Sequence, residues 1–170
     1  MSEDDSRRYC PRCATRLVHR SIETYDRLCC PACDFVFWDN PTPVVAALVE
    51  YDERLVFARN AAWPEGKFGL VTGFLEPRED PAAAVLREVT EELSLIGRIT
   101  CFIGAYGFAR NNQLLLAYHI LGQGEIRLNE ELIEYRLVAK HKARYRPAGT
   151  GLAVRDWLRA QGHDPQEREL

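Results

Sequence analysis

A cluster of carboxylates near the middle of the chain has the residue types and spacing to bind divalent cations. Glu88, Glu91 and Glu92 fall within five residues of a segment that predicts a helix. At about 3.6 residues per turn, their side chains share one helix face. Like charges so placed repel, and near the C-terminal end of a helix the dipole adds to that cost. Hard cations such as Mg²⁺ prefer oxygen ligands and would offset the repulsion, whereas the alternative interpretation is a solvated acidic face.

Residues at fixed offsets surround this cluster. Gly73 is followed by five spacers, Glu79, seven spacers and then Arg-Glu-Val-Thr-Glu-Glu over 87–92. The arrangement resembles the signature of the Nudix hydrolase family, Gly-x5-Glu-x7-Arg-Glu-U-x-Glu-Glu-x-Gly-U, in which U is a bulky aliphatic residue. One position departs, because Ser94 stands where the family has its last glycine. We expect Ser94 to alter the loop geometry at the helix exit and to leave the chemistry intact.

The resemblance implies a fold, a reaction and roles for the matching residues. It implies an α/β/α sandwich with a mixed sheet, and hydrolysis of a nucleoside diphosphate linked to another moiety with Mg²⁺ or Mn²⁺. Glu88, Glu91 and Glu92 match the metal-binding positions, and we expect Glu88 and Glu92 to be the strongest ligands. Arg87 is expected to hold a carboxylate through a charge-assisted hydrogen bond. Glu79 is expected to bind metal through water or to help place Arg87.

Two further residues are expected to take part in the reaction. Gly73 lets the backbone approach the metal or phosphate closely. The general base varies within the family between a signature glutamate and one on a later loop. Glu134 resembles the later glutamate of members that act on dinucleotides, and a solvated charge at a strand end is the alternative.

Substrate contacts are predicted from aromatic and basic residues near the signature. Trp63 precedes the signature strand and could either stack on a base or flavin or pack beneath its own loop. Phe74 is a candidate lining residue of the cleft, with a core position as the alternative. Arg59 and Arg110 are candidates to steer phosphates, although solvated surface arginines are common.

Two Cys-Pro-x-Cys knuckles, beginning at Cys10 and Cys30 and separated by sixteen residues, have the spacing of a Cys₄ zinc ribbon. The predicted Zn²⁺ ligands are Cys10, Cys13, Cys30 and Cys33. A disulfide pair or a redox dithiol is the alternative. Cys29 is expected to be a spare thiol beside the second knuckle. Cys101 lies in an apolar, strand-like run and is expected in the core.

A ribbon ahead of a Nudix domain resembles the NADH pyrophosphatase group and its relatives, including a plant flavin adenine dinucleotide and ADP-ribose pyrophosphatase. NADH pyrophosphatases carry a Ser-Gln-Pro-Trp-Pro-Phe-Pro-x-Ser motif that is absent from the corresponding stretch, 104–112. This absence favours flavin adenine dinucleotide or ADP-ribose over NADH. The expected partner is thus a small dinucleotide or nucleotide-sugar substrate. The second hypothesis is a non-catalytic regulator that senses a nucleotide or binds nucleic acid.

Composition places limits on the other function classes. The chain has 170 residues and a formal net charge of −3, without a basic stripe for nucleic acid. Its apolar runs are too short to span a bilayer, and no secretory signal is evident, so a cytoplasmic location is expected. Relatives are often dimers, which makes a homodimer possible.

The predicted organisation is a zinc ribbon over 9–38 and a Nudix domain over 43–161. Residues 1–8 are expected to be disordered, and 39–43 to be a stiff linker whose two prolines break any helix or strand ladder. Asp80 and Pro81 predict the start of the helix that carries the carboxylates. The predicted helices cover 81–93 and 150–161. The predicted strands cover 16–20, 25–29, 35–38, 44–51, 54–58, 69–75, 99–106, 113–121 and 133–139.

Overall fold

The computed structural model describes residues 9–168, so the disorder expected for residues 1–8 concerns positions outside the described residues. The chain divides into two compact units, Met1–Asn40 and Pro41–Leu170. Each unit has its own core, and the two are described separately below. Within the described residues, no helix has the length and apolar character that crossing a membrane requires.

The first unit is a small antiparallel sheet of three strands. Its strands are β1 (Val18–Ile22), β2 (Tyr25–Cys29) and β3 (Val36–Phe37), in that spatial order. The core contains little besides Cys10, Leu17 and Cys30, with Leu28 and Phe35 packed against them. So small an apolar cluster contributes little folding free energy, and a unit of this kind relies on a crosslink or a metal.

The second unit is built on a mixed six-stranded sheet. Its central strand β4 (Thr42–Tyr51) runs parallel to β8 (Gln113–Gln123) and antiparallel to its other neighbours. The order is β7 (Ile96–Phe108), β8, β4, β5 (Arg54–Asn60) and β9 (Leu132–Ala139), and β6 (Val71–Phe74) also pairs with β4. Two short 3₁₀ turns, Ala109–Asn111 and Lys140–Lys142, follow β7 and β9.

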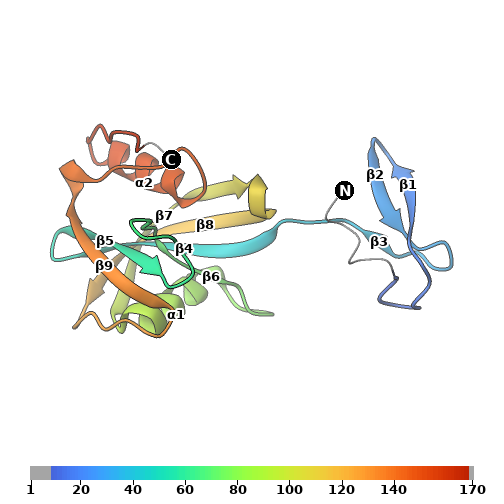
Figure 1. Ribbon diagram of the computed structural model, residues 1–170, viewed down its shortest axis with the longest axis horizontal. Coiled ribbons are helices and arrows are strands. Elements are labelled where there is room, and N and C mark those ends of the chain that lie inside the picture. Colours follow the sequence, from blue (N-terminus) through green and yellow to red (C-terminus); the bar gives the residue numbers. More distant parts are fainter. Residues whose placement is uncertain (1–8, 169–170) are drawn as a thin grey trace. The chain divides into compact units, whose positions relative to one another are not determined.

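Helices cover both faces of this sheet, as Figure 1 shows for α1 (Pro81–Leu93) and α2 (Thr150–Ala160). Successive residues of β4 point to opposite faces, so Val45 and Val49 pack with α1 whereas Ala46 and Leu48 pack with α2. Because both faces are buried, β4 is a continuous apolar run instead of an alternating one. The predicted α/β/α sandwich with a mixed sheet is confirmed.

The structure corrects two local predictions. Pro43 lies inside β4, opposite Leu114 of β8, so the proline-rich linker ends earlier than predicted. A proline is tolerated in the first residues of a strand, where few ladder bonds depend on its missing N–H. Cys101 is exposed instead of buried. It lies on the edge strand β7, where a register shift after Ile99 interrupts the alternation of the strand.

The sheet forks along β4. Residues 44–47 of β4 pair with β6, whereas residues 50–51 pair with β5. Between the two branches, β5 and the chain ahead of β6 are joined at Ala58 and Gly69, whose backbones exchange two hydrogen bonds of 2.9 Å. The fork therefore opens one side of the sheet next to the N-terminal half of β4.

Candidate active site

Helix α1 fixes the direction of the acidic side chains. Asp80 caps the helix by accepting hydrogen bonds from the second and third backbone N–H groups, and Pro81 begins it, as predicted. Val89 and its apolar neighbours along the helix are fully buried against the sheet. Burial of that stripe draws the adjacent Glu88 and Glu92 inward, and the two residues are only 9% and 6% exposed.

Arg87 connects three of the signature carboxylates. Its Nε and Nη2 donate to the two oxygens of Glu79 at 2.8 and 3.0 Å, a paired geometry. Its Nη1 donates to Glu88 at 2.7 Å and to Glu91 at 3.0 Å, and Nη2 also reaches the carbonyl of Phe74 at 3.3 Å. The hydrogen bonds from Arg87, followed by a backbone N–H bond, lower the pKa of Glu79 to about 2. Glu79 is thus an anion that holds Arg87 in place.

Gly73 leaves room for the Glu88 carboxylate. A Cβ at position 73 would lie 1.9 Å from the carboxyl carbon and one carboxyl oxygen of Glu88. No side chain fits there unless Glu88 moves. We expected the backbone at Gly73 to approach a metal or a phosphate. In this structure it approaches the Glu88 carboxylate.

Burial and mutual repulsion disfavour the ionised forms of Glu88 and Glu92. Burial is the main cause that raises the pKa of Glu92 to about 8, and the charges of Glu88, Glu131 and Glu91 add to it. Burial also raises the pKa of Glu88, although Arg87 opposes the shift. An all-oxygen donor set that is short of positive charge fits a hard divalent ion.

Glu88 and Glu92 face a large cavity of about 1320 Å³. Its walls come from the fork of the sheet, the loop before β6, and the segments that flank α2 and the 3₁₀ turn Lys140–Lys142. The acidic lining residues are Glu76, Glu88, Glu92 and Glu131. The basic lining residues are Lys67, Arg110, Arg136, Lys142, Arg144, Arg146 and Arg168. Acidic and basic side chains facing one cavity suit a polyanion that binds together with cations.

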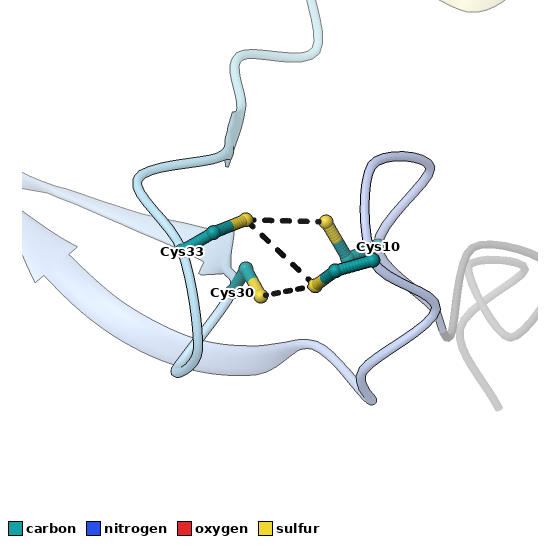
Figure 2. Close-up of side chains that lie close together, drawn as sticks. Cys10, Cys30 and Cys33 are labelled. Carbon is teal, nitrogen blue, oxygen red and sulfur yellow. Dashed lines mark hydrogen bonds between the residues drawn. The ribbon is translucent and has the colours of Figure 1, made fainter.

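The four predicted cysteines form a second candidate centre, in the first unit. Their sulfur atoms all lie within 4.8 Å of one another, and Figure 2 shows Cys10, Cys30 and Cys33 converging. Three Sγ···Sγ separations among them, of 3.4 to 3.8 Å, are close to the value of about 3.8 Å that tetrahedral zinc–sulfur bonds require. Hydrogen bonds with Thr15 lower the pKa of Cys13 to about 6, whereas burial and hydrogen bonds with the other three cysteines raise the pKa of Cys33 to about 12. Cys29 lies outside the cluster, as predicted.

Comparison with known families decides the relationship. The NUDIX domain profile matches residues 40–160. The chain belongs to the Nudix family. A Nudix hydrolase from Nitrosomonas europaea has the same fold, with a TM-score of 0.73, 22% identity, and 94% of this chain and 96% of that chain covered. An ADP-ribose pyrophosphatase from Streptococcus suis is similar with a TM-score of 0.59 and 15% identity over 75% of this chain and 97% of that one.

Sequence relatives of this Nudix chain include proteins named NAD-capped RNA hydrolase NudC. The one from Mycobacterium tuberculosis is 38% identical over 81 residues, which is 47% of this chain and 26% of that protein. The one from Stutzerimonas stutzeri is 29% identical over 128 residues, or 75% of this chain and 46% of that protein. The chain thus spans between about a quarter and a half of the length of these relatives.

The Nudix cavity brings together some of the predicted residues and omits others. Trp63, Gly73, Phe74 and Arg110 line it together with Glu88 and Glu92. Trp63 is half-buried with Lys67 above its ring, and Phe74 is 58% exposed. Glu91 is exposed and paired with Arg87, and it does not line the cavity.

Arg59 and Glu134 lie on neighbouring strands and pair with each other. Arg59 Nε and a Glu134 oxygen are 3.2 Å apart, and Arg136 contacts the other oxygen of Glu134 at 3.2 Å. Neither Arg59 nor Glu134 lines the cavity. The glutamate that does so is Glu131, three residues earlier, whose charge acts on both Glu88 and Glu92.

Ser94 ends the Nudix helix in a left-handed conformation, with φ 57° and ψ 24°. This is the conformation that a helix-terminating glycine adopts. Its N–H donates to the carbonyl of Thr90, and its hydroxyl donates to the carbonyl of Arg127 at 3.1 Å. The altered exit geometry expected at Ser94 is therefore not needed, because serine takes the backbone conformation of the family glycine.

The sequence analysis missed Glu131 and most of the basic residues that line the cavity. Glu131 directly precedes strand β9, the position that the later family glutamate has, and this was a signal for it in the sequence. The missed basic residues are Lys67, Arg136, Lys142, Arg144, Arg146 and Arg168. Basic residues at every second position from 142 to 146 (Lys142, Arg144 and Arg146) form a local signal that could have found part of this set.

Proposed function

We propose that this Nudix protein hydrolyses, with the help of a divalent metal, the pyrophosphate bond of a nucleoside diphosphate linked to another moiety. The observation that carries the proposal is the placement of Glu88 and Glu92. Both are buried, both face the cavity, and burial raises the pKa of both. A buried anionic pair without a metal-dependent role would cost stability to no benefit.

Glu88 and Glu92 would hold Mg²⁺ or Mn²⁺, and the ion would neutralise phosphate charge and activate water. Arg87 would keep one Glu88 oxygen fixed, leaving the other oxygen free to face the ion. Glu79 would position Arg87 and not touch the substrate, since both of its oxygens bind the guanidinium. Glu91 would contribute through Arg87.

We assign the general base to Glu131 in preference to Glu134. A base must lie within reach of the water that it deprotonates. Glu131 faces the cavity with the metal-binding pair, whereas Glu134 lies outside the lining and is held by Arg59 and Arg136. Glu131→Gln is expected to lower kcat at least about a hundredfold, and Glu134→Gln less than about threefold. The reverse order of effects would return the role to Glu134.

The substrate class is flavin adenine dinucleotide, ADP-ribose or NADH. Each joins two groups through a diphosphate, and the cavity is larger than the roughly 300–1,000 Å³ of typical ligand sites. The relatives named NAD-capped RNA hydrolase and the structural neighbour named ADP-ribose pyrophosphatase both support a nucleotide diphosphate. Half-buried Trp63 on the cavity wall suits stacking on a base or flavin.

A substrate panel with a matched pair of variants tests the proposal. NADH, flavin adenine dinucleotide, ADP-ribose, diadenosine polyphosphates and nucleoside triphosphates would be scored for phosphate or nucleoside monophosphate release with Mg²⁺ or Mn²⁺. Glu92→Gln should lower turnover by at least about a hundredfold, because it removes a metal ligand. Glu130→Gln, at an exposed position outside the lining, is the control. Binding of nucleotides without hydrolysis of any compound would favour a non-catalytic sensor instead.

We also propose that the four cysteines hold a structural Zn²⁺. Backbone N–H groups of Arg12 and Ala32 point at Cys10 and Cys30 sulfur atoms at 3.4 Å, which suits thiolates bound to a metal. Elemental analysis should give one zinc per chain. Cys30→Ser should lose the metal and the hydrogen-exchange protection of the small sheet, whereas Cys29→Ser should keep both. Equal losses in the two variants would contradict the ligand assignment.

A further inference from the structure

The cavity carries more positive charge than the proposed reaction requires. Seven basic side chains line it against four acidic ones. Three of the acidic groups, Glu88, Glu92 and Glu131, belong to the metal end. A linked diphosphate has about two negative charges, and bound divalent ions already neutralise charge there. Arg136 is paired with Glu134, and the lining cations that have no carboxylate partner are free for another anionic group.

Three of these cations follow β9 closely. Lys142 ends the 3₁₀ turn Lys140–Lys142, and Arg144 and Arg146 lie in the extended stretch after it, where side chains two residues apart point to the same side of the chain. Ala143 is buried in the core of the α2 face of the sheet, and Tyr145 packs against that core. Ala143 and Tyr145 therefore anchor the segment to the core, and the basic residues that alternate with them line the cavity.

Arg168 is tied to the same place by backbone bonds. Its N–H donates to the carbonyl of Tyr145 at 2.8 Å, and the N–H of Tyr145 donates to the carbonyl of Gln166 at 3.2 Å. Its guanidinium Nη2 donates to the carbonyl of Gly66 at 3.2 Å, next to Lys67. Arg168 thus connects the segment 142–146 with the loop before β6, and both contribute basic side chains to one wall.

The segment cations have no carboxylate partner among residues 9–168. Lys142, Arg144 and Arg146 take part in no ion pair there, whereas Arg59, Arg87, Arg127 and Arg155 do. Unpaired like charges that line one cavity repel one another, and an anion would relieve that cost. Arginine in particular suits phosphate, because its planar donors can bind two oxygens at once.

We infer that Lys142, Arg144, Arg146 and Arg168 form a second anion subsite, which takes a phosphate group outside the diphosphate that is cleaved. The inference rests on the proposed function for the position of the cleaved diphosphate at Glu88 and Glu92. The preferred substrates are then dinucleotides with a further phosphate on a ribose. That phosphate is either a 2′- or 3′-monoester or the first diester of an attached nucleic-acid chain, and both present the same anionic oxygens.

Binding tests this subsite independently of turnover. With Mg²⁺ present, calorimetry would compare AMP with adenosine 2′,5′-bisphosphate and adenosine 3′,5′-bisphosphate. At least one bisphosphate should bind about tenfold more tightly than AMP, as expected for one charge-assisted contact, and the difference should shrink with added salt. Arg144→Gln with Arg146→Gln should reduce the ratio to within about twofold of unity. Arg98→Gln with Arg159→Gln, at exposed positions outside the lining, should keep it.

Turnover then separates the two sources of phosphate. Ratios of kcat/KM would be measured for NADPH against NADH, coenzyme A against its 3′-dephosphorylated form, and a short NAD-capped oligonucleotide against NAD. A preference in either of the first two pairs indicates a monoester, and a preference in the third alone indicates a nucleic-acid chain. Arg144→Gln alone, at an exposed position, is a second variant that should lower the preferred ratio severalfold.

The outcomes distinguish this subsite from the hydrolase itself. Ratios within about twofold of unity for both bisphosphates, or a preference that survives the Arg144 and Arg146 substitutions, would overturn the subsite even in an active enzyme. A bisphosphate preference that depends on these arginines, in a protein that hydrolyses none of the dinucleotides, would uphold the subsite and overturn the hydrolase.

Discussion

Replacing Glu92 by Gln should lower the catalytic activity and raise the stability of the metal-free protein. Glu92 is 6% exposed, and its pKa is raised to about 8 from an ordinary 4.5. Because one pKa unit corresponds to about 1.4 kcal/mol, ionised Glu92 destabilises the metal-free fold by on the order of 2–5 kcal/mol. Glutamine has nearly the shape of the protonated acid and lacks the charge. The metal-free variant should therefore be more stable than the wild type although it is nearly inactive.

The sign of the pH dependence follows from the direction of the shift. The folded-state pKa is higher than the unfolded value, so the folded state binds more protons between the two. The Glu92 contribution is then fully present below about pH 4.5 and is lost as the pH rises through about 8. The stability difference between Glu92→Gln and wild type should grow across that window and level off above it.

Urea unfolding from pH 5 to 9 without added Mg²⁺ measures this difference. A Trp38→Phe background removes the tryptophan of the small unit, so that Trp63 and Trp157 report on the Nudix unit. Added Mg²⁺ should stabilise the wild type more than the variant and reduce the difference. Glu53→Gln, on an exposed turn, is the control for loss of one carboxylate. A Glu92→Gln protein that is less stable than wild type at pH 8 without metal would refute the electrostatic argument.

Three further substitutions test other parts of the structure. Gly73→Ala should displace the Glu88 carboxylate and lower kcat at least about tenfold, whereas Gly107→Ala, with open space around its Cβ position, should have little effect on kcat. Ser94→Gly and Ser94→Ala both remove the hydroxyl, so by urea unfolding the glycine variant should be more stable by about 1 kcal/mol, the cost of a Cβ at φ 57°. Burial lowers the pKa of His119, so its stabilising contribution should be lost as the pH falls below about 6.5, and His119→Gln should flatten that part of the stability profile. A wild-type profile that does not fall in acid relative to His119→Gln would contradict this.

The sequence predicted best the features that depend on local chemistry. The bounds of α1 follow from the Asp80 cap, the Pro81 start and the apolar stripe through Val89, all of which act within a few residues. The cysteine cluster follows from the knuckle spacing in the same way. The predicted strands were confirmed as elements, but β7 is longer than predicted, at Ile96–Phe108. Strand length depends on pairing with β8, which lies beyond any local pattern.

The features that sequence reasoning missed depend on contacts between distant segments. Arg168 reaches the cavity only because its backbone binds Tyr145 and its side chain binds Gly66. Glu131 is distinguished from its acidic neighbours by the direction that its loop gives it, not by residue type. His119 carried no ligand spacing, yet it is buried between Glu50 and Thr100 and stacks on Trp157 at 4.3 Å. Such roles arise from tertiary packing, which residue order alone does not reveal.

The bonds between Arg168 and Tyr145 bear on how this protein is best produced. The family match ends at residue 160, which invites a shortened form that stops after α2. Such a form would lack Arg168 on the cavity wall and leave the loop of Gly66 and Lys67 without its hydrogen bond to that residue. An affinity tag or fusion partner is accordingly better attached ahead of the cysteine knuckles than behind the last helix.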